Sequence, residues 1–218
     1  GEGSPLQIEL LATQRDNPQI ASQTLSLRPR SLPYRLDVTG GSVRFDGKTV
    51  TIESIRGRHD ASSFSADGFC VENNVGRWEL FLNLHSGCRL HPDAELIAAL
   101  PEQMQAAMRA LQLKGPLNIR GQTRIAMPDA THPEPTLGWD LTLQLEGNRI
   151  ADVGPVHSLR GEISIKGVRD ESAIRAFGEV RIDSMHINEI QITGIRGPFS
   201  IEDDLLSLGS LSRSPNAS

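Results

Sequence analysis

Residues 42–52 read Ser-Val-Arg-Phe-Asp-Gly-Lys-Thr-Val-Thr-Ile, and this stretch decides the fold class. Two runs that alternate apolar and polar residues flank the Asp46-Gly47 pair, and this period of two is typical of β-strands. Asp-Gly at such a place predicts a hairpin, because a type I′ turn needs positive φ at both central residues. A two-residue loop would pair Phe45 with Lys48 and Val43 with Val50. The apolar side chains then share one face: Val43, Phe45, Val50 and Ile52.

The same alternation recurs along most of the chain, between clusters of Gly, Asp and Asn. About a dozen short runs of this kind indicate a mostly β protein with an elongated, curved antiparallel sheet. One face of each strand is apolar and the other is polar, as in a sheet covered on one side only. The apolar positions of the later runs are Leu80, Leu82, Leu84, Leu117, Ile119, Leu141, Leu143, Leu145, Ile163, Ile165, Val180 and Ile182.

One segment breaks the strand pattern. Between residues 93 and 112 the apolar residues Leu96, Leu100, Met104, Met108 and Leu111 follow a helical spacing. Pro101 suits the first turn of a second helix, so the sequence predicts two short helices, 93–100 and 101–112, that end before Gly115-Pro116. This insert either caps or gates one end of the sheet, or plugs it by burying its apolar residues in the core.

The composition excludes several classes of function. The chain has 218 residues and a formal net charge of −5, so a nucleic-acid partner, which requires clustered Lys and Arg, is not expected. We find no phosphate-binding loop, no dinucleotide fingerprint and no Gly-x-Ser-x-Gly nucleophile elbow. Carboxylates are plentiful, but no spacing selects a catalytic pair. We therefore expect no enzyme activity and no cofactor.

The two cysteines allow two further interpretations. His85-x-x-Cys88-x-x-His91 has zinc-ligand chemistry, but its spacing is not that of an established structural zinc site, so we expect no metal. A Cys70–Cys88 disulfide is a second possibility. A hairpin around residues 73–76 would instead place Cys70 opposite Trp78–Leu80, so we favour free thiols.

A loose internal repeat organises the strands. Gly41-Ser42-Val43-Arg44-Phe45 resembles both 161–165 and 178–182, and each unit has the form Gly-x-aliphatic-x-aliphatic. We divide the chain into a poorly defined strand and loop entry (1–33), a β-repeat region with a helical insert (34–210, insert 93–112) and a tail (211–218).

The order of these units resembles the repeats of AsmA-like bacterial envelope proteins, which are similar to bridge-type lipid transporters. The resemblance covers about residues 34–210, and its most specific part is the strand, the helical block around Ala99-Leu100-Pro101, and then Gly115-Pro116 followed by a strand. It implies a long β-groove, apolar inside, that carries phospholipid across the periplasm. It also implies an inner-membrane anchor and further repeats, neither of which is in this sequence, so its partner would be the remainder of a longer membrane-anchored chain.

We therefore expect a non-catalytic fragment of the periplasmic cell envelope, whose apolar strand faces contact lipid acyl chains in lipid transport or outer-membrane biogenesis. The sixteen apolar strand positions named above are the candidate lining of this groove. The alternative is a structural or adhesive β-repeat spacer, in which the same residues form a dry core between two layers. A carbohydrate-acting domain is a third hypothesis and would need an exposed Trp139, whereas Trp78 and Trp139 both begin apolar strand faces, where buried anchoring is expected.

Overall fold

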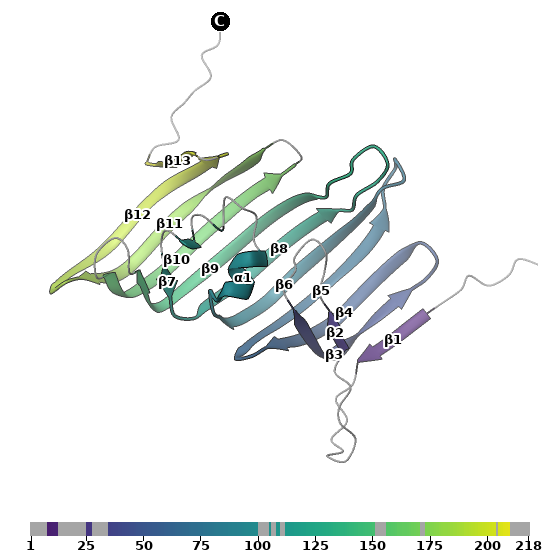
Figure 1. Ribbon diagram of the computed structural model, residues 1–218, viewed down its shortest axis with the longest axis horizontal. Helices are drawn as coiled ribbons and strands as arrows, with labels where there is room; N and C mark the ends of the chain where they lie inside the picture. The colour runs from purple at the N-terminus through teal and green to yellow at the C-terminus, as the bar shows by residue number, and fades with distance from the viewer. Residues whose placement is uncertain are drawn as a thin grey trace, which may run out of the picture.

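The computed structural model shows one curved sheet with two open ends (Figure 1). The mostly β, antiparallel fold predicted from the sequence is therefore confirmed. The structure describes residues 8–12, 25–27, 35–99, 105, 108–109, 112–150, 156–170, 173–203 and 205–209.

The described residues form a sheet of thirteen strands and one short helix. The elements in chain order are β1 (Ile8–Ala12), β2 (Leu25–Leu27), β3 (Leu36–Phe45), β4 (Thr49–His59), β5 (Ser62–Glu72), β6 (Trp78–Leu90), α1 (Ala94–Ala99), β7 (Leu113–Lys114), β8 (Leu117–Ala126), β9 (Thr136–Ile150), β10 (Val156–Arg169), β11 (Ile174–Ile187), β12 (Ile190–Glu202) and β13 (Leu205–Leu208).

The strands follow one another across the sheet in the order β1-β3-β4-β5-β6-β8-β9-β10-β11-β12-β13, and every pairing is antiparallel. From β3 to β13 each strand pairs with its neighbour in the sequence, apart from the step over the helical insert. The short strands β2 and β7 add to β3 and β9. β1 and β13 lie at the two ends of this order, so the sheet formed by the described strands is open.

The hairpin of residues 42–52 forms, but its register differs from the prediction by two residues. Phe45 pairs with Val50 and Val43 with Ile52, so the turn residues are Gly47-Lys48 rather than Asp46-Gly47. The Asp46 carboxylate accepts hydrogen bonds from the backbone N–H groups of Lys48 and Thr49 (3.0 and 2.8 Å), which fixes the later turn. When the pairing shifts by two residues, each side chain stays on the same face of the sheet. Val43, Phe45, Val50 and Ile52 therefore still share one face, as predicted.

The curvature comes from β-bulges that recur on neighbouring strands. The register shifts between Ile52 and Ile55 on β4, and similar irregularities interrupt β3, β5, β6 and β10. At the β4 bulge Ser54 has a φ of 49°, and its backbone N–H donates to the Asp67 carboxylate. Gly41 lies opposite with a φ of 116°, where a Cβ would meet the backbone of Ile55 at 2.6 Å. Bulges bend a strand and increase its twist, so this series curves the whole sheet.

The helical insert begins as predicted. The Asp93 side chain caps α1 by accepting a hydrogen bond from the backbone N–H of Leu96 (2.7 Å). The described part of α1 runs from Ala94 to Ala99, and Leu100, the last residue of the expected helix 93–100, lies outside the described residues. Of the expected second helix, only Gln105, Met108 and Arg109 are described as helical, and the rest of 101–111 lies outside the described residues.

Asn148 joins the insert to the sheet. Gly115-Pro116 interrupts the chain between β7 and β8, both of which pair with β9. The Asn148 side chain fills this break: its amide donates to the Pro116 carbonyl at 3.0 Å and its oxygen accepts from the Glu146 N–H at 2.9 Å. The side chain is fully buried, so these bonds replace the ladder bonds that proline and the break remove.

We expect Asn148→Ala to lower the free energy of unfolding by about 2–4 kcal/mol, because it leaves buried backbone groups without partners. Urea denaturation followed by circular dichroism measures the change. The matched control is Asn83→Ala, an exposed asparagine on β6, for which we expect a change within about 0.5 kcal/mol. Equal stability of the two variants would contradict the role given to Asn148.

Candidate functional site

One face of the sheet carries mostly apolar side chains, with few polar residues such as Thr123 and Arg169 among them. Residues directly opposite each other on antiparallel strands project from the same side, so the register defines rows of side chains that cross the sheet. One row runs from Ile119 through Leu143 and Ile163 to Val180. The row nearest the β3–β4 turn runs Phe45, Val50, Cys70, Leu80, Ile125 and Leu137.

All sixteen predicted lining residues lie on this face, which we call the apolar face. Leu117, Leu145 and Ile182 are buried, whereas the other thirteen are only partly buried. The sequence therefore identified which residues share a surface. These buried and partly buried side chains follow one another without a break from strand to strand, so they form one continuous surface.

The buried part of this face lies at one end of the strands. Leu117, Leu145, Leu159 and Ile182 form the core cluster, and Leu113 of β7, directly after the insert, packs against it. Of the insert residues expected in the core, Leu96 is half-buried, and Leu100 and Met104 lie outside the described residues. Two carboxylates at the start of the insert lie near His59 at the end of β4: Asp93 at 4.0 Å and Glu95 at 3.7 Å.

The rest of the apolar face has no second layer over it in the part of the chain that the structure describes. Extensive contacts between elements there occur only between hydrogen-bonded neighbours. A spacer with a dry core was expected to close into two layers. The described strands instead form a single open sheet.

Trp139 also lies on the apolar face, in the row with Leu82 and Thr123. Its ring packs over Gly167, where a Cβ would meet the Trp139 ring at 2.6 Å. The indole Nε1 is buried and has no hydrogen-bond partner among the described residues. The ring is therefore a packing anchor, and the exposed tryptophan platform that the carbohydrate hypothesis required is not formed by Trp139.

The opposite face, which we call the polar face, carries an aromatic and charged stack that the sequence did not single out. Phe69 and Phe81 stack across β5 and β6 with ring centroids 4.9 Å apart. The Arg124 guanidinium lies 5.5 Å from the centroid of the Phe81 ring. Glu79, which is buried, accepts hydrogen bonds from Arg124 at 2.8 and 3.0 Å and so holds it over the ring.

This hydrogen bonding explains the electrostatics of the pair. Arg124, and then the Asn73 amide, hold the pKa of Glu79 below its usual value of 4.5. The same contact raises the pKa of Arg124. Arg77, also buried, donates to the carbonyls of Met127 and Glu134 and so fixes the proline-rich loop that follows β8.

Among the described residues no group of three or more His, Cys, Asp or Glu side chains could hold a metal ion, and the Cys88 side chain lies outside the described residues. Cys70 is a free thiol opposite Leu80, as the hairpin predicted, and burial raises its pKa. His85 instead hydrogen-bonds Asp67, and this contact, followed by the Ser54 N–H, lowers the pKa of Asp67.

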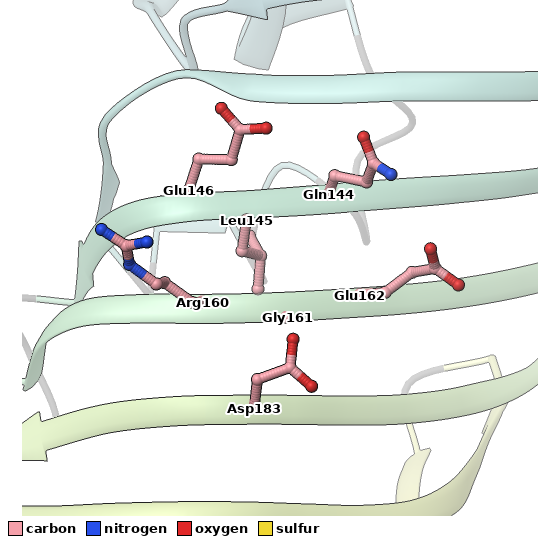
Figure 2. Close-up of a pocket in the computed structure, with 7 residues that line it drawn as sticks. All are labelled: Gln144, Leu145, Glu146, Arg160, Gly161, Glu162 and Asp183. Atoms are coloured by element: carbon pink, nitrogen blue, oxygen red, sulfur yellow. The ribbon is translucent and has the colours of Figure 1, made fainter.

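A small hollow on the polar face gathers charged groups (Figure 2). Its volume is about 310 Å³. Glu146, Arg160, Glu162 and Asp183 project into it from β9, β10 and β11, while Leu145 projects to the other side. Glu162 already pairs with Arg120 at 3.4 Å. The hollow lies beside the register shift of β10 at Arg160 and Gly161, and we interpret its charges as a solvated face of the sheet.

The Glu79 carboxylate should stabilise the fold in a pH-dependent way. We expect Glu79→Gln to lower the free energy of unfolding by about 1.5–3 kcal/mol at pH 7, because charge-assisted hydrogen bonds to a buried group are lost. The lowered pKa means that this stabilisation is present above pH 4.5 and is lost as the pH falls through the folded-state pKa. Thermal unfolding from pH 7 to pH 3 measures it.

The control for this prediction is Glu162→Gln, the same substitution in an exposed ion pair, for which we expect less than about 1 kcal/mol. If the difference between wild type and Glu79→Gln were constant across the pH range, the assignment of the pH dependence to Glu79 would be wrong.

None of the helices within the described residues is long and apolar enough to cross a membrane. Comparisons of the chain with protein-family models, with curated proteins and with solved structures gave no significant match.

Proposed function

We propose that the apolar face binds the acyl chains of phospholipid, and that the protein is a non-catalytic, lipid-contacting part of the cell envelope. The observation that carries this proposal is the apolar face itself: it continues across neighbouring strands and no second layer covers it within the described residues. Burying apolar surface is favourable, so such a face calls for an apolar partner.

The chemistry of the face suits a flexible hydrocarbon chain. Its central residues are aliphatic and half-buried, for example Leu141, Leu143 and Ile163. An acyl chain needs non-directional contact, and each buried CH₂ contributes about 0.8 kcal/mol. A covering protein layer would bring backbone groups that need hydrogen-bond partners, whereas an acyl chain has no polar groups to satisfy.

The architecture also supports the wider proposal of an AsmA-like repeat within a longer, membrane-anchored envelope protein. Successive strands pair as antiparallel hairpins across the sheet, and the described sheet has an edge strand at each end. Repeat proteins grow by adding such units at an edge, which extends the same face. Transport of lipid towards the outer membrane, and location in the periplasm, belong to this same proposal.

A lipid-retention experiment tests the proposal. We expect the purified protein, incubated with phosphatidylethanolamine and phosphatidylglycerol vesicles and then separated from them, to retain phospholipid in native mass spectrometry. Leu141→Asp removes the packing of the leucine side chain against two or three methylenes of the acyl chain, and it places a charge on the apolar face. The affinity should fall about tenfold or more, which follows from about 0.8 kcal/mol per CH₂.

The matched control is Thr142→Asp, which introduces the same charge at the next position of β9, on the polar face. We expect it to retain lipid as the wild type does. Failure of the folded wild type to take up lipid, or equal loss in both variants, would reject lipid binding and favour the spacer function. Circular dichroism of each variant establishes that the sheet is folded.

A further inference from the structure

A groove of about 960 Å³ crosses the strands on the polar face. Its lining residues come from three adjacent rows of the sheet. The middle row, which includes Leu82, Thr123 and Trp139, points its side chains to the apolar face, so only its backbone lines the groove. The two flanking rows point to the polar face and form the walls. The groove therefore lies behind the apolar face.

The dimensions of the groove follow from sheet geometry. It is lined by residues of β4, β5, β6, β8, β9 and β10. Strands lie about 4.8 Å apart, so the groove extends for about 24 Å across the sheet. Two rows on the same face are about 7 Å apart along the strand, which sets the spacing of its walls. The groove is long, narrow and open to solvent.

One wall is the stack of Phe69, Phe81 and Arg124. The Phe69 side chain is exposed, with 44% of its surface accessible, which is unusual for a large apolar residue. Beyond Arg124 the row reaches Gly138, which adds no side chain to this wall. This wall offers flat apolar and π surfaces.

The other wall is polar. Asn83 and Gln122 lie directly opposite each other on β6 and β8, and both are exposed. The Gln122 amide makes no hydrogen bond to the part of the chain that the structure describes. Next in the row, Asp140 pairs with Lys166 at 3.3 Å. An amide both donates and accepts hydrogen bonds, so this wall complements hydroxyl groups, which do the same.

The charges of both walls are balanced locally. Arg124 pairs with Glu79, Lys166 with Asp140, and Glu53 with Arg44 at 3.8 Å, while the Asp67 carboxylate hydrogen-bonds His85. A phosphate-rich or strongly charged ligand would need unpaired cations or anions. The groove is therefore complementary to a neutral ligand.

We propose that this groove binds a neutral oligosaccharide. The C–H faces of sugar rings pack on Phe69 and the stack behind it, while the sugar hydroxyls bond Gln122 and Asn83. A few placed polar groups beside apolar and aromatic surface are the usual design of a small-molecule site. An extended peptide fits less well, because the backbone groups of the floor are occupied in the strand ladders and peptides recognised by sheets pair with an edge strand.

Isothermal titration calorimetry of the full chain with three neutral hexasaccharides (chitohexaose, cellohexaose and maltohexaose) tests the proposal. We expect saturable binding of at least one of them. Gln122→Ala should weaken that binding about tenfold, as expected for the loss of one or two hydrogen bonds. Phe69→Ala should weaken it by a similar factor, through loss of packing surface.

The matched control is Gln144→Ala, the same substitution on the polar face of β9 but outside the groove, which should leave the affinity unchanged. The absence of saturable binding to all three sugars, or equal weakening by Gln144→Ala and Gln122→Ala, would overturn the proposal. An uncharged hexapeptide of alternating Ser and Ala serves as a competing probe. If the hexapeptide bound, if Gln122→Ala weakened its binding about tenfold, and if none of the sugars bound, the groove would be a peptide-binding site. Lipid retention by the apolar face is measured separately and does not depend on this outcome.

Discussion

The structure depends on the antiparallel ladder that keeps apolar side chains in register from strand to strand. Because opposite residues project from one side, a period of two in each strand becomes a continuous surface across the sheet. Leu143 shows the effect, since it lies between Ile119 and Ile163 with no polar residue intervening in that row. At one end of the strands this surface is buried in the core cluster, against which Leu113 of β7 packs, and along the rest we have proposed that lipid covers it.

Bending is built into the backbone rather than into the packing of a second layer. The bulges on β3 to β6 and on β10 put extra residues on single strands, and these residues need unusual φ angles or local hydrogen-bond partners. Asp67 shows how the sequence meets this requirement, because its carboxylate accepts from the Ser54 N–H and from His85. A side chain on the polar face thus stabilises a bend that shapes the apolar face.

Most of the fold could be predicted from the sequence because strand alternation is a local signal. The faces of Val43, Phe45, Val50 and Ile52 were predicted correctly even though the turn was placed one residue too early, since a shift of two in the pairing preserves the face. The turn itself was missed because it depends on the Asp46 side chain bonding to backbone two and three residues on. The Asp-Gly pattern alone does not distinguish these two turns.

Other features required contacts that no local pattern reveals. Asn148 bonds with Pro116, 32 residues away, and Glu79 with Arg124, 45 residues away, so nothing near either residue indicated its role. Alternation with Leu80 and Leu82 is enough to put Phe81 on the polar face, but its stacking with Phe69 depends on the pairing of β5 with β6. The groove on the polar face could not be predicted from the sequence. The alternation of apolar and polar residues indicates the face on which a side chain lies, but not where two rows of side chains leave a groove between them.

The near-sequential strand order has a consequence for how the chain assembles. Almost every strand pairs along one edge with the strand that precedes it in the sequence. Each new strand therefore adds to an edge that has already formed, and only a short loop has to close. Folding of this kind can proceed as the chain is synthesised, by growth at one edge, and does not wait for distant segments. Until each strand is followed by the next, its edge is a template for any other strand. The rate at which hairpins are added, relative to encounters between molecules, therefore sets whether the protein folds alone or joins a neighbour.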